Sequence, residues 1–428
     1  MRLRSFTVVA VVAVIATTVV ASPMQARAVT VAPLLDNYDG ENIDDNYIVV
    51  LKDSAHPAKQ RLDGHFSWLT ADIERANARA PAYRDSNRVS HVYGNTVVGY
   101  AGRFEPEVLE RIRSSDDVAY VERDSVVYTQ ETQHGAPWGL ARISHRKPLG
   151  FGTFNKYIHD AEAGAGVTVY VVDTGINVDH VDFDGRARWG KTVPLNDVDE
   201  DKNGHGTHVA GTIAGKRYGV AKSAEVVAVK VLGSNGSGSM SDVVMGVEYT
   251  VKEHRKAAAK ASREGKAHAS VANMSLGGGF SRALNLAVDA AVRSGVHYAV
   301  AAGNDNRDAC GYSPASSPNA ITVGATTIVD ERAWFSNYGK CVDVFAPGKD
   351  ILSTWIGGKT RTNTISGTSM ASPHVAGLAA YLLSQEKSIS LSGAELKSRM
   401  IELATKDAVE DPGEDSPNVL IYNDPPSA

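Results

Sequence analysis

The sequence VTVYVVDTG at residues 167–175 contains six apolar or β-branched residues in a row, followed by Asp-Thr-Gly. An uninterrupted run of this kind is typical of a strand buried on both faces of a parallel sheet. Similar runs recur at residues 226–232, 270–274, 296–301 and 321–323. Helical stretches lie between several of them, at residues 207–214, 242–262 and 282–294. Strands that alternate with helices predict crossover connections, and therefore a three-layer α/β fold with a parallel sheet and helices on both faces.

A different pattern precedes this region, at residues 47–128. The strand candidates are residues 47–51, 89–93, 97–104 and 118–121, and the helix candidates are residues 57–77 and 105–114. Their order is β-α-β-β-α-β, which is that of a small α+β unit of the ferredoxin-like type. The polar, acidic residues 29–46 read as a flexible lead-in to this unit.

The N-terminus has the features of a secretory signal peptide. Arg2 and Arg4 precede a stretch without charge at residues 6–21, and an Ala-Arg-Ala triplet follows at residues 26–28. A basic start, a short apolar run and an Ala-x-Ala site predict cleavage after residue 28. The alternative is a membrane anchor, but 16 residues are short for a span of about 20. We therefore expect a product that enters the secretory pathway and has no stable association with membranes.

The composition excludes several classes of protein. The chain has 428 residues, a net charge of −5 and two cysteines. So small a net charge gives no reason to expect a nucleic-acid partner. Two cysteines exclude a disulfide scaffold and a zinc site of four thiolates. In an oxidising pathway they can instead form one bridge, Cys310–Cys341.

Three polar residues stand where functional groups gather in an open parallel sheet, at strand ends and helix starts. They are Asp173, His205 and Ser369, in the segments VVDTG (171–175), NGHGTHVAG (203–211) and SGTSMASPHVAG (366–377). Together they supply a carboxylate, a base and a hydroxyl in the chain order Asp, His, Ser. The set predicts nucleophilic catalysis by Ser369.

Each of the three residues also has an ordinary explanation when it is taken alone. Asp173 could be a turn residue, and Ser369 could be a helix cap. His205 and His208 could bind a metal, although no Glu stands between them as a zinc hydrolase would need. The catalytic interpretation therefore depends on the three residues occurring in one chain.

The three segments resemble the signature blocks of the subtilisin-like serine proteases. Further segments resemble the proteinase K branch and, within it, the fungal cerevisin group: APWGLARI (136–143), NMSLGGG (273–279) and FAPG (345–348). The similarity covers nearly all of the chain from residue 131 to about residue 385. It implies a subtilisin-like fold and a serine endopeptidase that needs no cofactor for catalysis. It also implies broad specificity, with a preference for apolar or aromatic residues before the scissile bond.

The N-terminal unit resembles the inhibitor-type propeptide of the same family. The resemblance implies three parts: a signal peptide at residues 1–28, a propeptide at residues 29–130 with its core at 47–128, and a peptidase domain at residues 131–428. The protein would then be a self-processing zymogen, most simply monomeric, that acts on proteins and peptides and is inhibited by its own propeptide. Secretion from the cell and retention in a vacuole both remain open, because both routes begin with a signal peptide.

The resemblance also implies roles for residues outside the triad. Asn304 corresponds to the amide that donates to the oxyanion. Gly236, Ser237 and Gly238 correspond to the edge that pairs with the substrate main chain, and Ser275, Leu276 and Gly277 to the opposite wall. The primary specificity pocket would then lie between residues 275–277 and 301–303, and its small lining residues, among them Ala301 and Gly303, would leave room for an apolar or aromatic side chain.

A structural calcium ion is implied at one further place. Pro318 and Ala320 correspond to residues whose carbonyls bind calcium in the proteinase K branch, and Asp343 to a carboxylate ligand. The chain departs from that branch because it lacks the second disulfide, and because Val209 stands where proteinase K has a free cysteine. Two rival functions stay open: a catalytically silent binding protein on the same fold, and an esterase.

Overall fold

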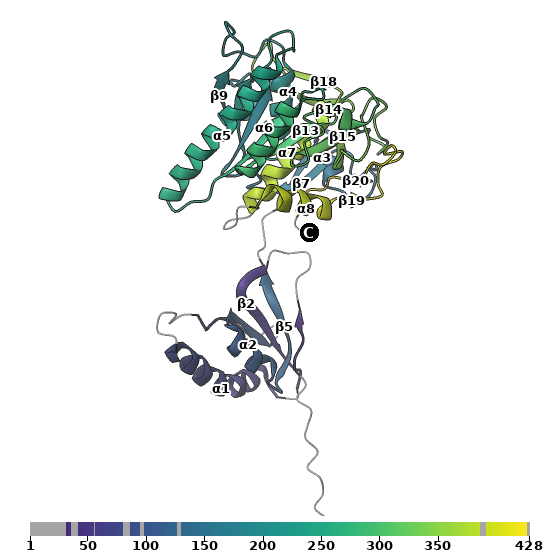
Figure 1. The fold of residues 1–428 in the computed structure, drawn as a ribbon. Coiled ribbons are helices and arrows are strands. Elements are labelled where there is room, and N and C mark those ends of the chain that lie inside the picture. The colour runs from purple at the N-terminus through teal and green to yellow at the C-terminus, as the bar shows by residue number, and fades with distance from the viewer. Residues whose placement is uncertain are drawn as a thin grey trace, which may run out of the picture. The chain divides into compact units, whose positions relative to one another are not determined.

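The computed structural model describes residues 31–35, 42–54, 56–79, 86–94, 98–125, 130–385 and 391–425. The chain divides into two compact units, Met1–Val127 and Tyr128–Ala428 (Figure 1). The expected signal peptide at residues 1–28 lies outside the described residues.

The smaller unit is a sheet covered by two helices. Its elements are β1 (Leu34–Leu35), β2 (Asn42–Leu51), α1 (Ala58–Arg79), β3 (Arg88–Tyr93), β4 (Gly99–Arg103), α2 (Pro106–Arg113) and β5 (Val118–Ser125). The strand order is β1-β5-β2-β4-β3, and β2 pairs antiparallel with both β4 and β5. The predicted β-α-β-β-α-β order is confirmed from β2 to β5, and the short β1 extends the sheet parallel to β5.

The core of this unit forms where α1 and α2 pack on the sheet. Leu69 of α1 and Ile112 of α2 are fully buried against Tyr100 and Val121 of the strands. His65 is buried among them, and its Nε2 lies 3.0 Å from the hydroxyl of Tyr100. The helical spacing seen in the sequence therefore marks the faces that pack on the sheet.

Nine strands form the central sheet of the larger unit, in the order β19-β20-β16-β15-β13-β11-β8-β10-β9. They are β8 (Val167–Asp173), β9 (Ala187–Thr192), β10 (Glu225–Lys230), β11 (Ala269–Met274), β13 (Val296–Ala301), β15 (Ile321–Thr326), β16 (Val344–Pro347), β19 (Thr405–Lys406) and β20 (Val419–Leu420). Every neighbouring pair is parallel except β19 and β20. The predicted parallel sheet is confirmed.

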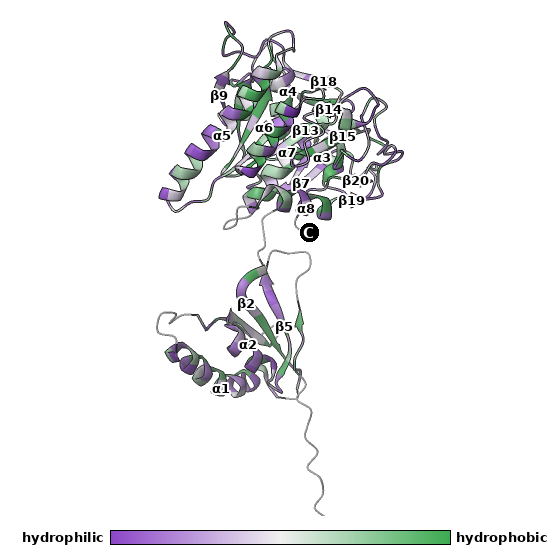
Figure 2. Cartoon of the chain, in the orientation of Figure 1, coloured by the Kyte–Doolittle hydropathy of each residue, from purple (hydrophilic) through white to green (hydrophobic). Residues whose placement is uncertain are grey.

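Helices cover both faces of this sheet. They are α4 (His205–Ala214) and α7 (Thr368–Gln385) on one face, and α5 (Met240–Arg263) and α6 (Arg282–Arg293) on the other. Strand β8 shows why residues 167–172 are apolar or β-branched without interruption. Val169 and Val171 belong to the core under α4 and α7, whereas Tyr170 and Val172 belong to the core under α5 and α6. Figure 2 shows hydrophobic residues concentrated on the central strands.

The remaining elements of the larger unit are short. They are α3 (Trp138–Ile143), α8 (Gly393–Leu403), the pairs β6 (Gln130–His134) with β7 (Lys156–Asp160), β12 (Gly278–Gly279) with β14 (Tyr312–Ser313) and β17 (Ile351–Thr354) with β18 (Thr362–Ile365), and two 3₁₀ turns, η2 (Val181–Phe183) and η3 (Ala309–Gly311). A disulfide joins Cys310 and Cys341, whose Cα atoms lie 5.3 Å apart.

One strand ends earlier than the sequence predicts. Residues 226–232 are all apolar except Lys230, yet β10 ends at Lys230. The N–H groups of Val231 and Leu232 both donate to the carbonyl of Asp173, at 2.9 and 3.2 Å, which stops the ladder. The chain then turns away over the carboxyl ends of the strands, where the candidate site lies.

Candidate active site

Asp173 is the last residue of β8, and its side chain is fully buried. Its two carboxylate oxygens lie 2.8 and 3.0 Å from Nδ1 of His205. The N–H of Thr174 also donates to Oδ1 of Asp173, at 2.7 Å. A buried carboxylate held by two donors fixes the orientation of the imidazole, and it gives Nδ1 the proton.

His205 is the first residue of α4, and Asp201 holds the loop that precedes it. Oδ1 of Asp201 accepts from the N–H groups of Asn203 and Gly204, at 3.0 and 2.9 Å. Oδ2 accepts from the N–H and the hydroxyl of Thr207, at 3.0 and 2.6 Å. Gly204 takes a φ of 100°, in the left-handed region that favours glycine. One buried carboxylate therefore ties both sides of His205 in place.

The electrostatic surroundings of His205 favour its charged form. Burial alone lowers the pKa of His205, but the carboxylates of Asp173 and Asp201 raise it. The net result is a pKa above the ordinary value of 6.5. The imidazole consequently picks up a proton at a higher pH than a histidine in water.

Ser369 is the second residue of α7. Its Oγ donates to the carbonyl of Ser275 at 3.2 Å, and Oγ of Ser275 donates to the carbonyl of Ser369 at 2.7 Å. The side chain of Asn273 bridges the hydroxyls of Ser275 and Ser372, at 2.8 Å each. This network joins the end of β11 to the start of α7.

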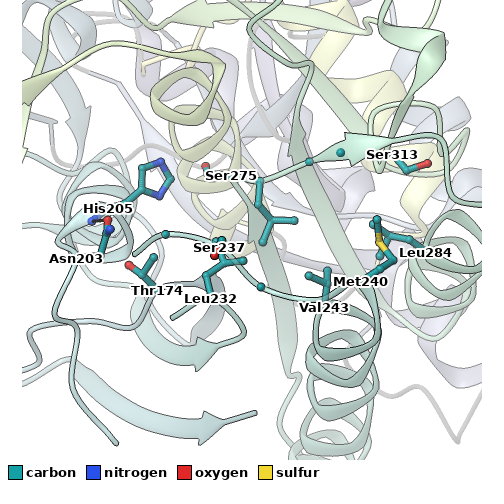
Figure 3. Close-up of a pocket in the computed structure, with 15 residues that line it drawn as sticks. Thr174, Asn203, His205, Leu232, Ser237, Met240, Val243, Ser275, Leu284 and Ser313 are labelled. Carbon is teal, nitrogen blue, oxygen red and sulfur yellow. Dashed lines mark hydrogen bonds between the residues drawn. The ribbon is translucent and has the colours of Figure 1, made fainter. Parts of the chain in front are cut away.

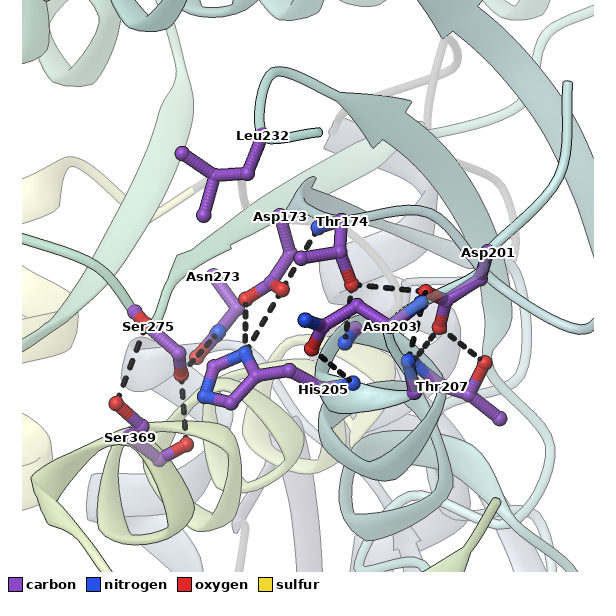
Figure 4. A network of polar contacts seen from close by, with 12 residues as sticks. Asp173, Thr174, Asp201, Asn203, His205, Thr207, Leu232, Asn273, Ser275 and Ser369 are labelled. Carbon is purple, nitrogen blue, oxygen red and sulfur yellow. Dashed lines mark hydrogen bonds and ion pairs between the residues drawn. The ribbon is translucent and has the colours of Figure 1, made fainter. Parts of the chain in front are cut away.

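The hydroxyl of Ser369 and the ring of His205 form no hydrogen bond with each other in the part of the chain that the structure describes. Figure 4 shows the ring of His205 between Asp173 and Ser369, with its second nitrogen on the side of Ser369. Rotation about the Cα–Cβ bond of Ser369 takes Oγ off the Ser275 carbonyl. Contacts between nucleophile and base are often long in free enzymes and tighten when substrate binds.

Asn304 lies beyond the end of β13, and its side chain faces the same space as Ser369. Its Oδ1 accepts from the N–H and the hydroxyl of Thr368, at 2.8 and 2.9 Å. The hydroxyl of Thr368 in turn accepts from the N–H of Gly303 at 3.1 Å. Because Oδ1 is occupied in this way, the NH₂ group of Asn304 is free to donate to an oxyanion.

The position of Gly367 marks the space between two donors. A Cβ at this residue would lie 3.5 Å from the backbone N of Ser369 and 3.6 Å from Nδ2 of Asn304. An atom-sized space therefore faces both N–H donors beside the Ser369 hydroxyl. This is the geometry required to stabilise a developing negative charge on oxygen.

Two hollows lie on either side of the wall that starts at Ser275. One has a volume of about 450 Å³. Its lining includes His205, Leu232, Gly236, Met240, Leu276 and Leu284 (Figure 3). The other has a volume of about 320 Å³, and its lining includes Leu276, Gly277, Ala301, Gly303, Asn304, Tyr312 and Ser369. The residues predicted as substrate walls thus gather around these two hollows.

The predicted substrate edge at residues 236–238 is not a regular strand. The N–H of Gly236 donates to the carbonyl of Gly233, and the carbonyl of Ser237 accepts from the N–H of Gly233, both at 2.9 Å. Within the described chain, the N–H and carbonyl of Gly238 and the carbonyl of Gly236 have no backbone partner. These groups are available to an extended peptide.

The residues expected to bind calcium do not fit that ion. The ammonium group of Lys397 lies 3.1 Å from the carbonyl of Pro318 and 2.9 Å from Oδ2 of Asp343. No hydrogen bond from Lys397 to Ala320 is present among the described residues. Two of the three oxygens expected as calcium ligands, on Pro318 and Asp343, are thus already bonded to a positively charged group.

Two residues of the site were missed by sequence reasoning. Asp201 stands four positions before His205, and only the folded loop brings its carboxylate within reach of five donors, the fifth being the hydroxyl of Thr174 at 3.0 Å. Lys230 reads as part of a strand, but its buried ammonium donates to the carbonyls of Thr174 and Leu232, at 2.9 Å each. It also lies 3.3 Å from a carboxylate oxygen of Asp197. Lys230 thereby ties the turn after Asp173 to the start of the substrate edge.

No helix among the described residues is both long and apolar enough to span a membrane. In the same residues, no cluster of three or more His, Cys, Asp or Glu side chains is suited to hold a metal ion.

Comparisons with known proteins agree with this geometry. Residues 164–417 match the subtilase family of peptidases, and residues 46–130 match the I9 family of peptidase inhibitors. The chain is 52% identical to "Alkaline protease 2" of Aspergillus fumigatus over 432 residues, which covers 95% of this chain and 86% of that protein. It is also 52% identical to "Subtilisin-like serine protease Pen ch 18" of Penicillium rubens, with the same coverage.

A solved structure described as a cold-adapted subtilisin-like serine proteinase is 45% identical. It superposes with a TM-score of 0.61 and covers 68% of this chain and 98% of its own. Taken together, the fold, the arrangement of Asp173, His205 and Ser369 and these similarities show that the chain belongs to the subtilase family of serine endopeptidases, with an I9-type inhibitor domain before the peptidase.

Proposed function

We propose that Ser369 is the nucleophile that attacks the carbonyl carbon of the scissile peptide bond. His205 accepts the hydroxyl proton on its second nitrogen and then delivers it to the leaving amine, which gives an acyl-enzyme on Ser369 Oγ. Water attacks this ester in the second half, with His205 again as base. Asp173 holds the ring and stabilises its charged form. The contact between Asp173 and His205, at 2.8 Å, is the single observation that carries this assignment.

The oxyanion of each tetrahedral intermediate is assigned to the backbone N–H of Ser369 and the NH₂ group of Asn304. Both donors face the space beside Gly367. Neither donor titrates near neutral pH, so the site keeps its positive potential while His205 gains and loses its proton. Nucleophile, base and donors are all groups of the chain, so the mechanism uses no cofactor.

For the substrate, we propose an extended peptide that lies between Gly236–Gly238 and Ser275–Gly277. Main-chain hydrogen bonds to such edges tolerate most sequences. Alternate side chains would enter the two hollows, and the residue before the scissile bond would enter the one lined by Ala301 and Gly303. The lining of small residues favours an apolar or aromatic side chain there, which cleavage of a peptide library would test.

We also propose that the protein is a zymogen. Its parts would be a signal peptide at 1–28, an inhibitory propeptide at 29–130 and a peptidase at 131–428. The I9 match at residues 46–130 supports this division. Separately made residues 29–130 should suppress hydrolysis by the mature enzyme, and the absence of suppression would contradict the inhibitory role.

For the branch and destination, we propose the proteinase K branch, with closest similarity to the cerevisin group, and entry into the secretory pathway. The segments at residues 136–143, 273–279 and 345–348 support the branch. The N-terminal residues 1–28 support the pathway. Delivery outside the cell and delivery to a vacuole are distinguished by fractionation of the producing cells.

The decisive experiment measures casein hydrolysis by the wild type, by Ser369→Ala and after treatment with a serine-directed sulfonyl fluoride. We expect activity to be lost in the last two. Ser398→Ala, at an exposed serine on α8, is the matched control and should retain full activity. Activity that survives both Ser369→Ala and the inhibitor would refute the assignment. A protein active on esters but not on casein would favour the esterase.

A further inference from the structure

A cation site lies between the segment before β15 and the segment before β16, at Pro318 and Asp343. Oδ2 of Asp343 accepts from the N–H of Thr322 at 2.9 Å, and the N–H of Asp343 donates back to the carbonyl of Thr322 at 2.9 Å. The carboxylate of Asp343 is therefore held by the backbone of Thr322. It and the carbonyl of Pro318 both face the Nζ atom of Lys397.

Lys397 reaches this site from α8, which is firmly attached to the larger unit. Ser392 and Glu395 form a capping box at the start of the helix. Leu396 and Met400 are fully buried in the main core. The helix approaches α6 so closely that a Cβ at Gly393 would meet a side-chain carbon of Val292. The position of Lys397 is thus set by the packing of α8.

The charges at the site balance without a metal ion. The side chain of Lys397 is 18% exposed and that of Asp343 is 23% exposed, so the pair is largely shielded from water. One ammonium neutralises one carboxylate. A calcium ion would need six to eight oxygen ligands, and it would add two positive charges next to the ammonium group of Lys397.

We propose that the ammonium group of Lys397 is the built-in cation of this site, and that the chain takes no calcium between Pro318 and Asp343. The ammonium group binds the same carbonyl and carboxylate oxygens that a structural ion would bind there. It links the segment before β15 to the segment before β16, and it fastens both to α8. This inference concerns stability and does not depend on the proposed catalytic roles.

The test uses the full chain with Ser369→Ala, which prevents self-digestion. In this background, Lys397→Met removes the ammonium and keeps most of the stem. Arg399→Met is the matched control, because Arg399 is an exposed cation two positions along the same helix. Hydrogen exchange of peptides that cover residues 315–323 and 341–347 is followed in EDTA and in millimolar CaCl₂, together with the midpoint of thermal unfolding.

Without either methionine substitution, both peptides should exchange at the same rate in EDTA and in calcium. Lys397→Met in EDTA should exchange at least about tenfold faster at these peptides, and its midpoint should fall by about 5 °C. Arg399→Met should show neither change, and Lys397→Arg should restore most of the protection. Calcium-dependent protection of residues 315–323 with Lys397 present would overturn the proposal. So would a Lys397→Met protein that behaves like Arg399→Met.

Discussion

Oδ1 of Asn304 accepts two hydrogen bonds from one residue, Thr368, at 2.8 Å from its N–H and 2.9 Å from its hydroxyl. The residue that precedes the nucleophile therefore orients the amide that faces the oxyanion space. Two hydrogen bonds to one oxygen leave the amide a single favourable orientation, with its NH₂ group toward the substrate.

Replacement of Asn304 by Leu should lower kcat by about 10²–10³, which is the cost known for loss of such a donor in a subtilisin. KM should change little, because the donor acts on charge that develops in the transition state. Thr368→Val removes the hydroxyl but keeps the backbone N–H, so its loss should be smaller, about tenfold. Kinetics on a chromogenic peptide measure both. An Asn304→Leu enzyme whose KM rises by the same factor as its kcat falls would contradict the oxyanion role.

Gly367→Ala should fill the space between the two donors. The added Cβ would lie 3.5 Å from the N of Ser369 and 3.6 Å from Nδ2 of Asn304, which are ordinary contacts, but the φ of 159° at Gly367 is one that side chains rarely adopt. We expect kcat/KM to fall by about 10²–10³, and the backbone strain should lower the midpoint of thermal unfolding by about 2–8 °C.

Gly152→Ala is the control for this change, since nothing lies within 4 Å of a Cβ at that exposed position. It should change neither quantity. A Gly367→Ala enzyme with normal kcat/KM would show that the oxyanion sits elsewhere.

Asp201→Asn should shift the pH dependence of activity. The base must be neutral, so activity falls as the pH drops through the pKa of His205, which its carboxylate neighbours raise above 6.5. Removal of the Asp201 charge lowers that pKa, so the acid limb of kcat/KM should move to lower pH. The substitution also places an NH₂ group opposite the N–H of Thr207, where the wild type has an accepting oxygen. The loop that holds His205 is then less well fixed, so kcat at high pH should fall about tenfold.

Asp199→Asn is the matched control, because its partner is the hydroxyl of Thr192, at 2.7 Å. The acid limb of the kcat/KM profile of Asp199→Asn should coincide with that of the wild type. An unshifted limb in Asp201→Asn would show that Asp201 holds the loop without acting on the charge of His205.

His297→Leu should make the larger unit less sensitive to acid. Burial first, and then the neighbouring His254, lower the pKa of His297 from 6.5 to about 4. The folded state thus binds fewer protons than the unfolded state as the pH falls from 6.5 to about 4. The stability that neutral His297 permits is complete above pH 6.5 and is lost progressively across this window.

The loss amounts to about 3 kcal/mol at pH 4, at 1.36 kcal/mol for each pKa unit. Urea unfolding of Ser369→Ala proteins at pH 8 and pH 4 measures it. Between pH 8 and pH 4, the free energy of unfolding should fall by about 3 kcal/mol less in the His297→Leu protein than in the protein that keeps His297. His208 and His374, whose pKa values are also lowered to about 4, remain in both proteins. An equal loss would show that His297 does not contribute.

Much of the fold follows from local pattern. The run at residues 167–172 is apolar or β-branched at every position because β8 is buried on both faces, and such a run is typical of a parallel sheet. The alternation of strands and helices then sets the layers, and functional residues of such a sheet gather where its strands end. Such a pattern predicts Asp173, His205 and Ser369, since each lies at the end of a strand or within the first two residues of a helix. A single sequence could not show that Asn304 and Thr368 share two hydrogen bonds.

The sequence by itself determined the two units, the parallel sheet and the chemical types available at its edge, because periodicity and motif spacing are local properties. Tertiary structure decided which groups meet. Asp201 accepts hydrogen bonds from the residues on both sides of His205 only when its loop closes, and Lys230 reaches Thr174 only across paired strands. Lys397, 54 positions from Asp343, takes the place of an expected calcium ion because α8 packs beside it. The partner of a buried charge is set by packing between distant segments, and no local pattern records that packing.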